Sequence, residues 1–143
     1  MSKFKIDKET EYLIAILGPR TKGHYSLIMP AVIRAIDHVE NREKRTGFVF
    51  MHDGVTSGST GEVMEAVNKI QGSLSNYGRF ATLRKLPLDI EMHGKNSHFK
   101  WISAALELKP DLFVVIDDGS ALAQFAINQS KKNKIAIDIV GLV

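Results

Sequence analysis

Apolar runs alternate with amphipathic stretches along the whole chain. Each run is short and bounded by glycine, proline or polar residues, which is typical of strands buried on both faces. The predicted strands are 12–17, 47–52, 79–86, 112–116 and 135–140. Between them, apolar residues at helical spacing predict helices that begin near Ser26, Thr60, His98 and Ala121.

This alternation predicts an α/β fold in one Rossmann-like domain covering residues 1–143, with residues 1–10 as a polar leader. The sheet should be five-stranded and mostly parallel, with helices on both faces and the first strand in its centre. We expect Ser26 to cap the first helix, with Pro30 in its first turn, and Gly78 to end the second. The predicted core positions of the helices are Leu27, Ile28, Ala31, Val32, Ala35, Ile36, Val39, Val63, Met64, Val67, Ile70, Leu74, Ile102, Ala105, Leu106, Leu122, Phe125 and Ala126, with Trp101 partly buried.

The composition fits one domain with a real core, since 44% of the 143 residues are apolar. The net charge of +3 permits an anionic ligand without requiring nucleic acid. The one compact basic group, Lys131, Lys132 and Lys134, suits the C-terminal end of a helix dipole. Without cysteine, a signal-peptide pattern or an apolar run long enough to span a membrane, the chain is expected to be cytoplasmic, with no membrane partner.

Three loops are expected to meet at the carboxyl edge of the sheet, where open α/β sheets bind ligands. They are residues 18–25, 53–61 and 117–120. The second is rich in glycine and hydroxyl side chains and precedes a helix, an arrangement that favours an anion such as phosphate. The alternative is a plain strand-to-helix turn capped by serine or threonine.

The loops carry neither the dinucleotide G-x-G-x-x-G pattern nor the P-loop pattern. Instead, Leu17-Gly18-Pro19-Arg20-Thr21 resembles the G-S/P-R turn of the SLOG superfamily, the Rossmann-like group that includes DprA and the LOG-type phosphoribohydrolases. The stretch 52–60 is similar to that group's H-G-G-A-x-G-A-D loop, and 110–120 resembles its P-D-x-v-v-a-f-p-G-G-x-G-T stretch. The resemblance implies a pocket for a nucleotide or nucleotide-derived molecule, often in a homo-oligomer.

The same comparison argues against LOG-type hydrolysis. That family uses a glutamate in P-G-G-x-G-T-x-x-E, whereas this chain has Gln124 or Phe125 there, and a neutral amide cannot act as a base. Asp117 and Asp118 replace the first glycines and would repel phosphate, unless they accept ribose hydroxyls or hold a metal ion. Glu62 is the weak candidate for a replacement catalytic acid, and its simpler role is a favourable charge in a helix first turn.

Charge and residue type suggest roles for individual side chains. Arg20 suits a bidentate phosphate contact, Lys22 a second cation and Tyr25 a stack on a base. Asp117 or Asp118 accepts from ribose or caps the helix near Ala121. The candidate ligand-binding residues are Gly18, Arg20, Thr21, Lys22, Tyr25, Asp53, Ser57, Gly58, Ser59, Thr60, Gly61, Asn96, Asp117, Asp118, Gly119 and Ser120.

Histidines 24, 52, 93 and 98 lack metal-ligand spacing, so we expect neither a metal nor another cofactor. The leading hypothesis is a protein that binds, and so senses or sequesters, a nucleotide-derived ligand such as a cyclic nucleotide or an ADP-ribose-type signal. The first alternative is an N-glycosidic-bond hydrolase or transferase acting on nucleotides. The second is DprA-like binding of single-stranded DNA, which the modest net charge favours less.

Overall fold

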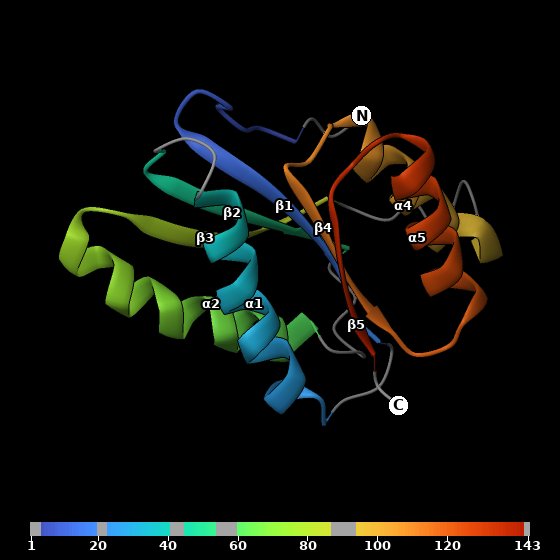
Figure 1. Ribbon diagram of the computed structural model, residues 1–143, viewed down its shortest axis with the longest axis horizontal. Helices are drawn as coiled ribbons and strands as arrows, with labels where there is room; N and C mark the ends of the chain where they lie inside the picture. Colours follow the sequence, from blue (N-terminus) through green and yellow to red (C-terminus); the bar gives the residue numbers. More distant parts are fainter. Residues whose placement is uncertain (1–3, 20–22, 41–44, 54–59, 87–93, 142–143) are drawn as a thin grey trace.

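Five parallel strands form one sheet in the order β3-β2-β1-β4-β5, as seen in a computed structural model (Figure 1). The structure describes residues 4–19, 23–40, 45–53, 60–86 and 94–141. The strands are β1 Glu11–Leu17, β2 Gly47–His52, β3 Phe80–Lys85, β4 Leu112–Asp117 and β5 Ile137–Gly141. The predicted Rossmann-like α/β fold is confirmed, with β1 in the centre of the sheet.

Among the described residues, two pairs of helices cover the two faces of the sheet. They are α1 Tyr25–Glu40, α2 Thr60–Leu74, α4 Ser97–Glu107 and α5 Ala121–Lys132, with short 3-10 turns η1 Ser75–Tyr77 and η2 Gly94–Asn96. Figure 1 shows α1 and α2 on one side of the sheet and α4 and α5 on the other. The crossovers from β1 to β2 and from β3 to β4 therefore run over opposite faces.

The central strand β1 is buried along its entire length. Because side chains alternate along a strand, Tyr12, Ile14 and Ile16 face α1 and α2, while Leu13 and Ala15 face α4 and α5. Fully burying one such leucine or isoleucine stabilises the fold by about 1.5–3 kcal/mol. This two-sided burial explains why β1 reads in the sequence as a continuous apolar run.

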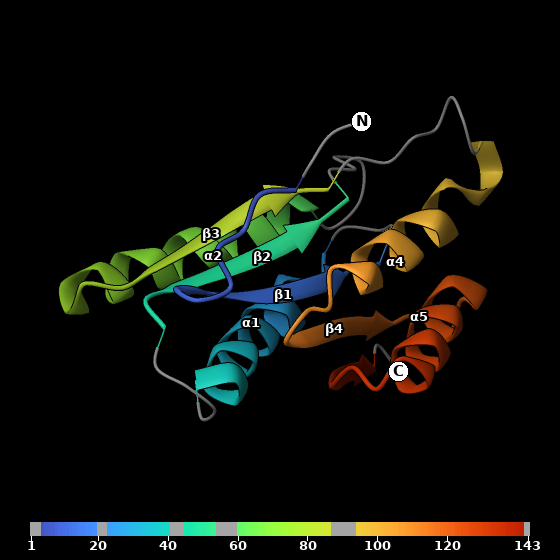
Figure 2. The same cartoon turned by 90° about the horizontal axis from the view of Figure 1, so that it is seen from above.

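Part of the polar leader is packed against the sheet. Phe4 and Ile6 contact the core beneath α4 and α5, and Arg84 of β3 donates to the Lys5 carbonyl at 2.9 Å. Figure 2 shows this segment passing over β3 and β2. Phe4 and Ile6 thus add to the apolar cover of that face beside the described helices α4 and α5.

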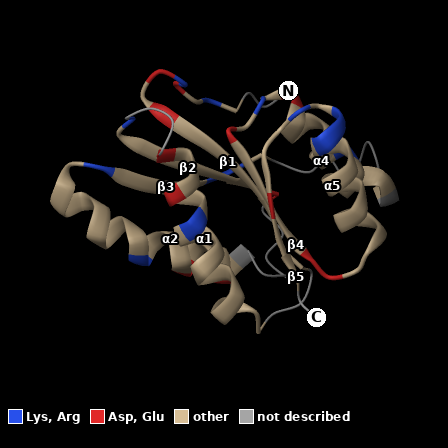
Figure 3. Ribbon diagram, in the orientation of Figure 1, with Lys and Arg blue, Asp and Glu red and all other residues tan. Residues whose placement is uncertain are grey.

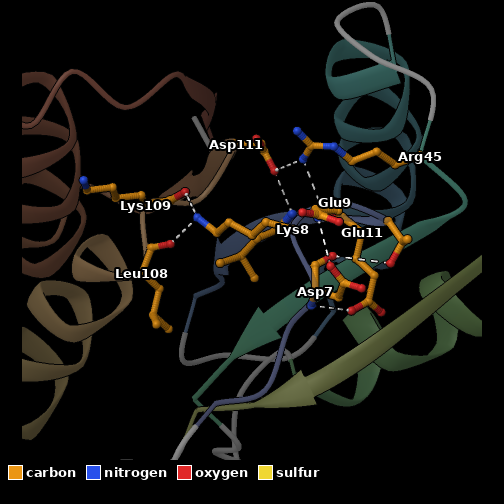
Figure 4. A network of polar contacts seen from close by, with 10 residues as sticks. Asp7, Lys8, Glu9, Glu11, Arg45, Leu108, Lys109 and Asp111 are labelled. Atoms are coloured by element: carbon orange, nitrogen blue, oxygen red, sulfur yellow. Dashed lines mark hydrogen bonds and ion pairs between the residues drawn. The ribbon is translucent and has the colours of Figure 1, made fainter.

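A polar network closes the amino edge of the sheet (Figure 4). The Lys8 ammonium donates to the carbonyls of Leu108 and Lys109, the latter at 2.6 Å, at the end of α4. Burial lowers the pKa of Lys8, although Asp111 partly opposes this. Asp111 also accepts from the Leu13 amide at 2.9 Å and pairs with Arg45 at 3.5 Å. These contacts fix the start of β1 against the start of β4.

The predicted start of α1 is wrong in detail. The helix begins at Tyr25, and the amides of Leu27 and Ile28 donate to the His24 carbonyl at 3.0 Å. Ser26 therefore lies inside the first turn and does not cap it, and Pro30 falls in the second turn. The helix tolerates Pro30 with the loss of one backbone hydrogen bond, since proline has no amide hydrogen.

Other local predictions divide between confirmed and corrected. Gly78 does end the second helical segment, with a φ of 69° and its amide donating to the Ser75 carbonyl at 3.2 Å. Met64 is 46% exposed, so it is not a core residue as predicted. Trp101 is only 3% exposed, and its indole N–H donates to the Leu86 carbonyl at 2.8 Å. That hydrogen bond explains why the tryptophan is more deeply buried than expected.

Candidate ligand-binding site

The strand order creates a crevice at the carboxyl edge of β1 and β4. From β1 the chain crosses one face of the sheet to β2, whereas β4 is reached over the opposite face. The loops that leave β1 and β4 therefore diverge, and such a switch point is where open α/β sheets bind ligands.

A pocket of about 330 Å³ lies at this switch point. Its lining residues are Leu17, Gly18, Phe99, Ile116, Asp118, Ser120, Ala121, Leu122 and Ala123. Most of these side chains are apolar, while Asp118 and Ser120 supply polar atoms. This volume lies at the lower end of the range of about 300–1,000 Å³ that is typical of small-molecule sites.

The loop between β4 and α5 is held in place by its own side chains. Asp117 accepts from the Gly119 amide at 2.9 Å, and Asp118 accepts from the Ser120 amide at 3.0 Å. Gly119 has a φ of 79°, a conformation that suits glycine. The Ser120 hydroxyl caps α5 by accepting from the Ala123 amide at 3.1 Å. The suggested aspartate cap is therefore wrong, because both aspartates make turns within the loop and the serine is the cap.

Glu62 joins the first turn of α2 to the start of α1. Its carboxylate accepts from the backbone amides of Gly23, His24 and Tyr25, each at 3.1 Å for the shortest contact. Amides at a helix N-terminus are the groups that commonly bind phosphate. In this chain an internal carboxylate already occupies them.

Tyr25 also contributes to the contact between α1 and α2. The Lys69 ammonium lies 5.3 Å from the centre of the Tyr25 ring, within cation–π range. Gly61 is exposed in the first turn of α2. Asn96 is exposed at the end of η2 and makes no side-chain cap for α4.

His52 and Asp53 follow one another at the carboxyl end of β2. His52 is 9% exposed, and this burial lowers its pKa; Asp53 partly raises it, and Lys85 adds a smaller lowering effect. Asp53 itself is half-buried. Since β2 neighbours β1, both residues belong to the same edge of the sheet as the pocket.

The structure thus brings some of the predicted site residues together and does not describe others. Gly18, Asp118 and Ser120 line the pocket, and Asp117 and Gly119 belong to the same loop. Several predicted residues lie outside the described residues: Arg20, Thr21, Lys22, Ser57, Gly58 and Ser59, together with the side chain of Thr60.

Sequence reasoning missed the apolar part of the pocket. The sequence places Leu17 and Ile116 in strands and Leu122 in a helix core, and it assigns none of the three to a site. Phe99 reaches the pocket from α4. The ends of β1 and β4 carried a usable signal, because residues there necessarily border a switch point. The sequence around Phe99 carries no such signal, because only the crossover between β3 and β4 places this residue at the pocket.

The described surroundings of the pocket are acidic. Figure 3 shows acidic residues at the end of β4 and in the loop that follows it. Among the described residues, no lysine or arginine lines the pocket. No group of three or more histidine, aspartate or glutamate side chains within the described ranges is arranged to hold a metal ion.

The fold and the pocket together define a Rossmann-like α/β protein with a pocket at its switch point. No protein-family model, curated protein or solved structure matches the chain. Within the described residues, no helix has the length and apolar character needed to cross a membrane.

Proposed function

We propose that the pocket between the loops after β1 and β4 binds a nucleotide-derived small molecule, and that the protein senses or sequesters this ligand. The observation that carries the proposal is the pocket's place at the switch point, with Asp118 and Ser120 beside apolar walls. The resemblance of three loop segments to the SLOG superfamily favours the same ligand class, and it also favours a homo-oligomer.

Binding is a better proposal than cleavage of a glycosidic bond. Gln124 or Phe125 stands where the LOG-type enzymes that the chain resembles have glutamate, and the Gln124 amide nitrogen lies 3.4 Å from an Asp117 oxygen. Glu62, the other candidate acid, has both carboxylate oxygens in contact with backbone amides. Gln124 is an amide and the Glu62 carboxylate is held by backbone amides, so neither offers a free carboxylate. Asp118 is a carboxylate that does line the pocket, and the turnover assay described below tests it as a catalytic acid.

Isothermal titration calorimetry tests the proposal. The panel contains nucleoside mono-, di- and triphosphates, cyclic mono- and dinucleotides, and ADP-ribose. We expect at least one member to bind, and we expect the variant Ala121→Phe, which adds a ring to the pocket lining, to weaken binding at least tenfold. Asn128→Phe is the matched control, because Asn128 is exposed on the same helix and does not line the pocket.

Two results would contradict the proposal. The first is the absence of binding at high micromolar concentration for every member of the panel. The second is a bound ligand whose affinity is the same in Ala121→Phe as in the control. Chromatography of the ligand after incubation tests the absence of turnover, since release of free base would show that the protein is an enzyme.

A further inference from the structure

The aspartate that ends β4, Asp117, and the one that follows it, Asp118, differ in how their oxygens are used. Asp117 is half-buried, and its two oxygens contact the Gly119 amide and the Gln124 side chain. Asp118 is exposed and lines the pocket, and one of its oxygens accepts from the Ser120 amide. Among the described residues, none donates to its second oxygen. Asp118 is therefore a fixed carboxylate with an acceptor available at the pocket.

The rest of the pocket suits a flat and uncharged group. Leu17, Ile116 and Leu122 provide aliphatic surface, and Phe99 provides a ring. Phe99 is itself supported by Phe125, with the ring centres 5.2 Å apart and the planes at 78°. Apolar and aromatic walls of this kind are typical of sites for heterocyclic rings.

Phosphate is disfavoured in the same pocket. Asp118 would repel an anion, and no described lysine or arginine lines the pocket to offset that charge. Some amides at nearby helix N-termini already have an internal acceptor: Glu62 accepts from the amides at the start of α1, and the Ser120 hydroxyl accepts from the Ala123 amide of α5. A phosphate at either position would have to displace that acceptor.

We infer that the pocket receives the nucleoside end of the ligand, with Asp118 accepting hydrogen bonds from the ribose hydroxyls, and that the phosphate lies outside the pocket. This inference rests on the proposed function and makes it more specific. It distinguishes Asp118, which recognises the sugar, from Asp117, which supports the loop.

Calorimetry with adenosine, guanosine, cytidine, uridine, their 5′-monophosphates and their 2′-deoxy counterparts tests the inference. We expect at least one ribonucleoside to bind within about tenfold of its monophosphate, and its 2′-deoxy form to bind about tenfold more weakly, the loss expected for one hydrogen bond to a charged group. In Asp118→Asn the preference for ribose should fall to about threefold, because a neutral acceptor forms a weaker bond. Asp37→Asn, which removes an exposed carboxylate of α1, should keep the full preference.

The outcomes separate this inference from the proposed function. If neither these compounds nor any member of the nucleotide and ADP-ribose panel binds, both are refuted. If nucleotides bind but ribose and 2′-deoxyribose forms bind equally, the proposed function stands and the inference is wrong. Tighter binding of a monophosphate to Asp118→Asn than to the wild type would also overturn it, because that result would place the phosphate beside the carboxylate.

Discussion

Replacing Glu62 with alanine removes the contact that joins the first turn of α2 to the start of α1. The carboxylate accepts from three successive backbone amides, those of Gly23, His24 and Tyr25, at 3.1 Å for the shortest contact to each. The substitution therefore removes the described side-chain acceptor at the start of α1. We expect the variant to fold with a lower free energy of unfolding.

The size of the loss follows from the kind of contact. Hydrogen bonds to a charged group stabilise a protein by about 1.5–3 kcal/mol, and loss of a helix cap costs about 0.5–2 kcal/mol. Because this site is partly exposed and water can replace the carboxylate, we expect a loss of about 2 kcal/mol. For 143 residues the entropy of unfolding is about 0.3 kcal/mol/K, so the melting temperature should fall by about 7 °C.

Urea denaturation followed by circular dichroism measures this change. The matched control is Glu65→Ala, which removes an exposed carboxylate from the same helix and should change the stability by less than about 0.5 kcal/mol. Hydrogen exchange should show faster exchange at the amides of Gly23, His24 and Tyr25 in Glu62→Ala alone. Equal stability of the two variants, or unchanged exchange at these amides, would refute the assigned role of Glu62.

Three further substitutions test the core, a helix end and a buried histidine. Trp101→Phe removes the indole donor to the Leu86 carbonyl at 2.8 Å and leaves that oxygen unpaired, so urea denaturation should show a loss of about 2 kcal/mol; an unchanged midpoint would mean that the bond does not stabilise the fold. Lys134 has a φ of 58°, so Lys134→Gly should gain about 1 kcal/mol, whereas Lys132→Gly at the last residue of α5 should lose up to about as much; losses in both would contradict the assigned strain. Burial lowers the pKa of His52 from 6.5, so as the pH falls below that value the unfolded chain binds more protons than the folded one and the free energy of unfolding decreases. The slope of the free energy of unfolding against pH should be smaller in His52→Gln, by up to about 1.4 kcal/mol per pH unit. Identical slopes in the two proteins would rule out this effect.

The sequence predicts the sheet well because a strand that is buried on both faces has apolar residues at successive positions. Every residue of β1 and β2 is buried, so both strands read as continuous apolar runs. The packing of Phe4 and Ile6 cannot be predicted in this way, because two apolar side chains within a charged segment form neither a continuous apolar run nor a periodic pattern. Trp101 was placed too near the surface because the partner of its indole N–H, the Leu86 carbonyl, is 15 residues away in the chain.

The site is predictable only where it follows from the ends of strands. Gly18 comes directly after β1, and Asp118 comes directly after β4. Their place at one edge of the sheet therefore follows from the parallel pairing of the two strands. Phe99 enters the pocket from α4, and Glu62 reaches the start of α1 from α2. Contacts of this kind join elements far apart in the chain, and neither helical nor strand periodicity encodes them.

The position of Glu62 also bears on where a phosphate of the ligand lies. A phosphate that bound the amides at the start of α1 would first displace the Glu62 carboxylate, at a cost close to the 2 kcal/mol expected for Glu62→Ala. A cost of about that size weakens binding about 30-fold. If the phosphate binds there, Glu62→Ala should therefore bind a nucleoside monophosphate much more tightly than the wild type, while its affinity for the nucleoside stays the same. If the phosphate lies elsewhere, both affinities should be unchanged, and the pocket would then select the nucleoside end of its ligand through Asp118, with no described lysine or arginine in its lining to hold the other end.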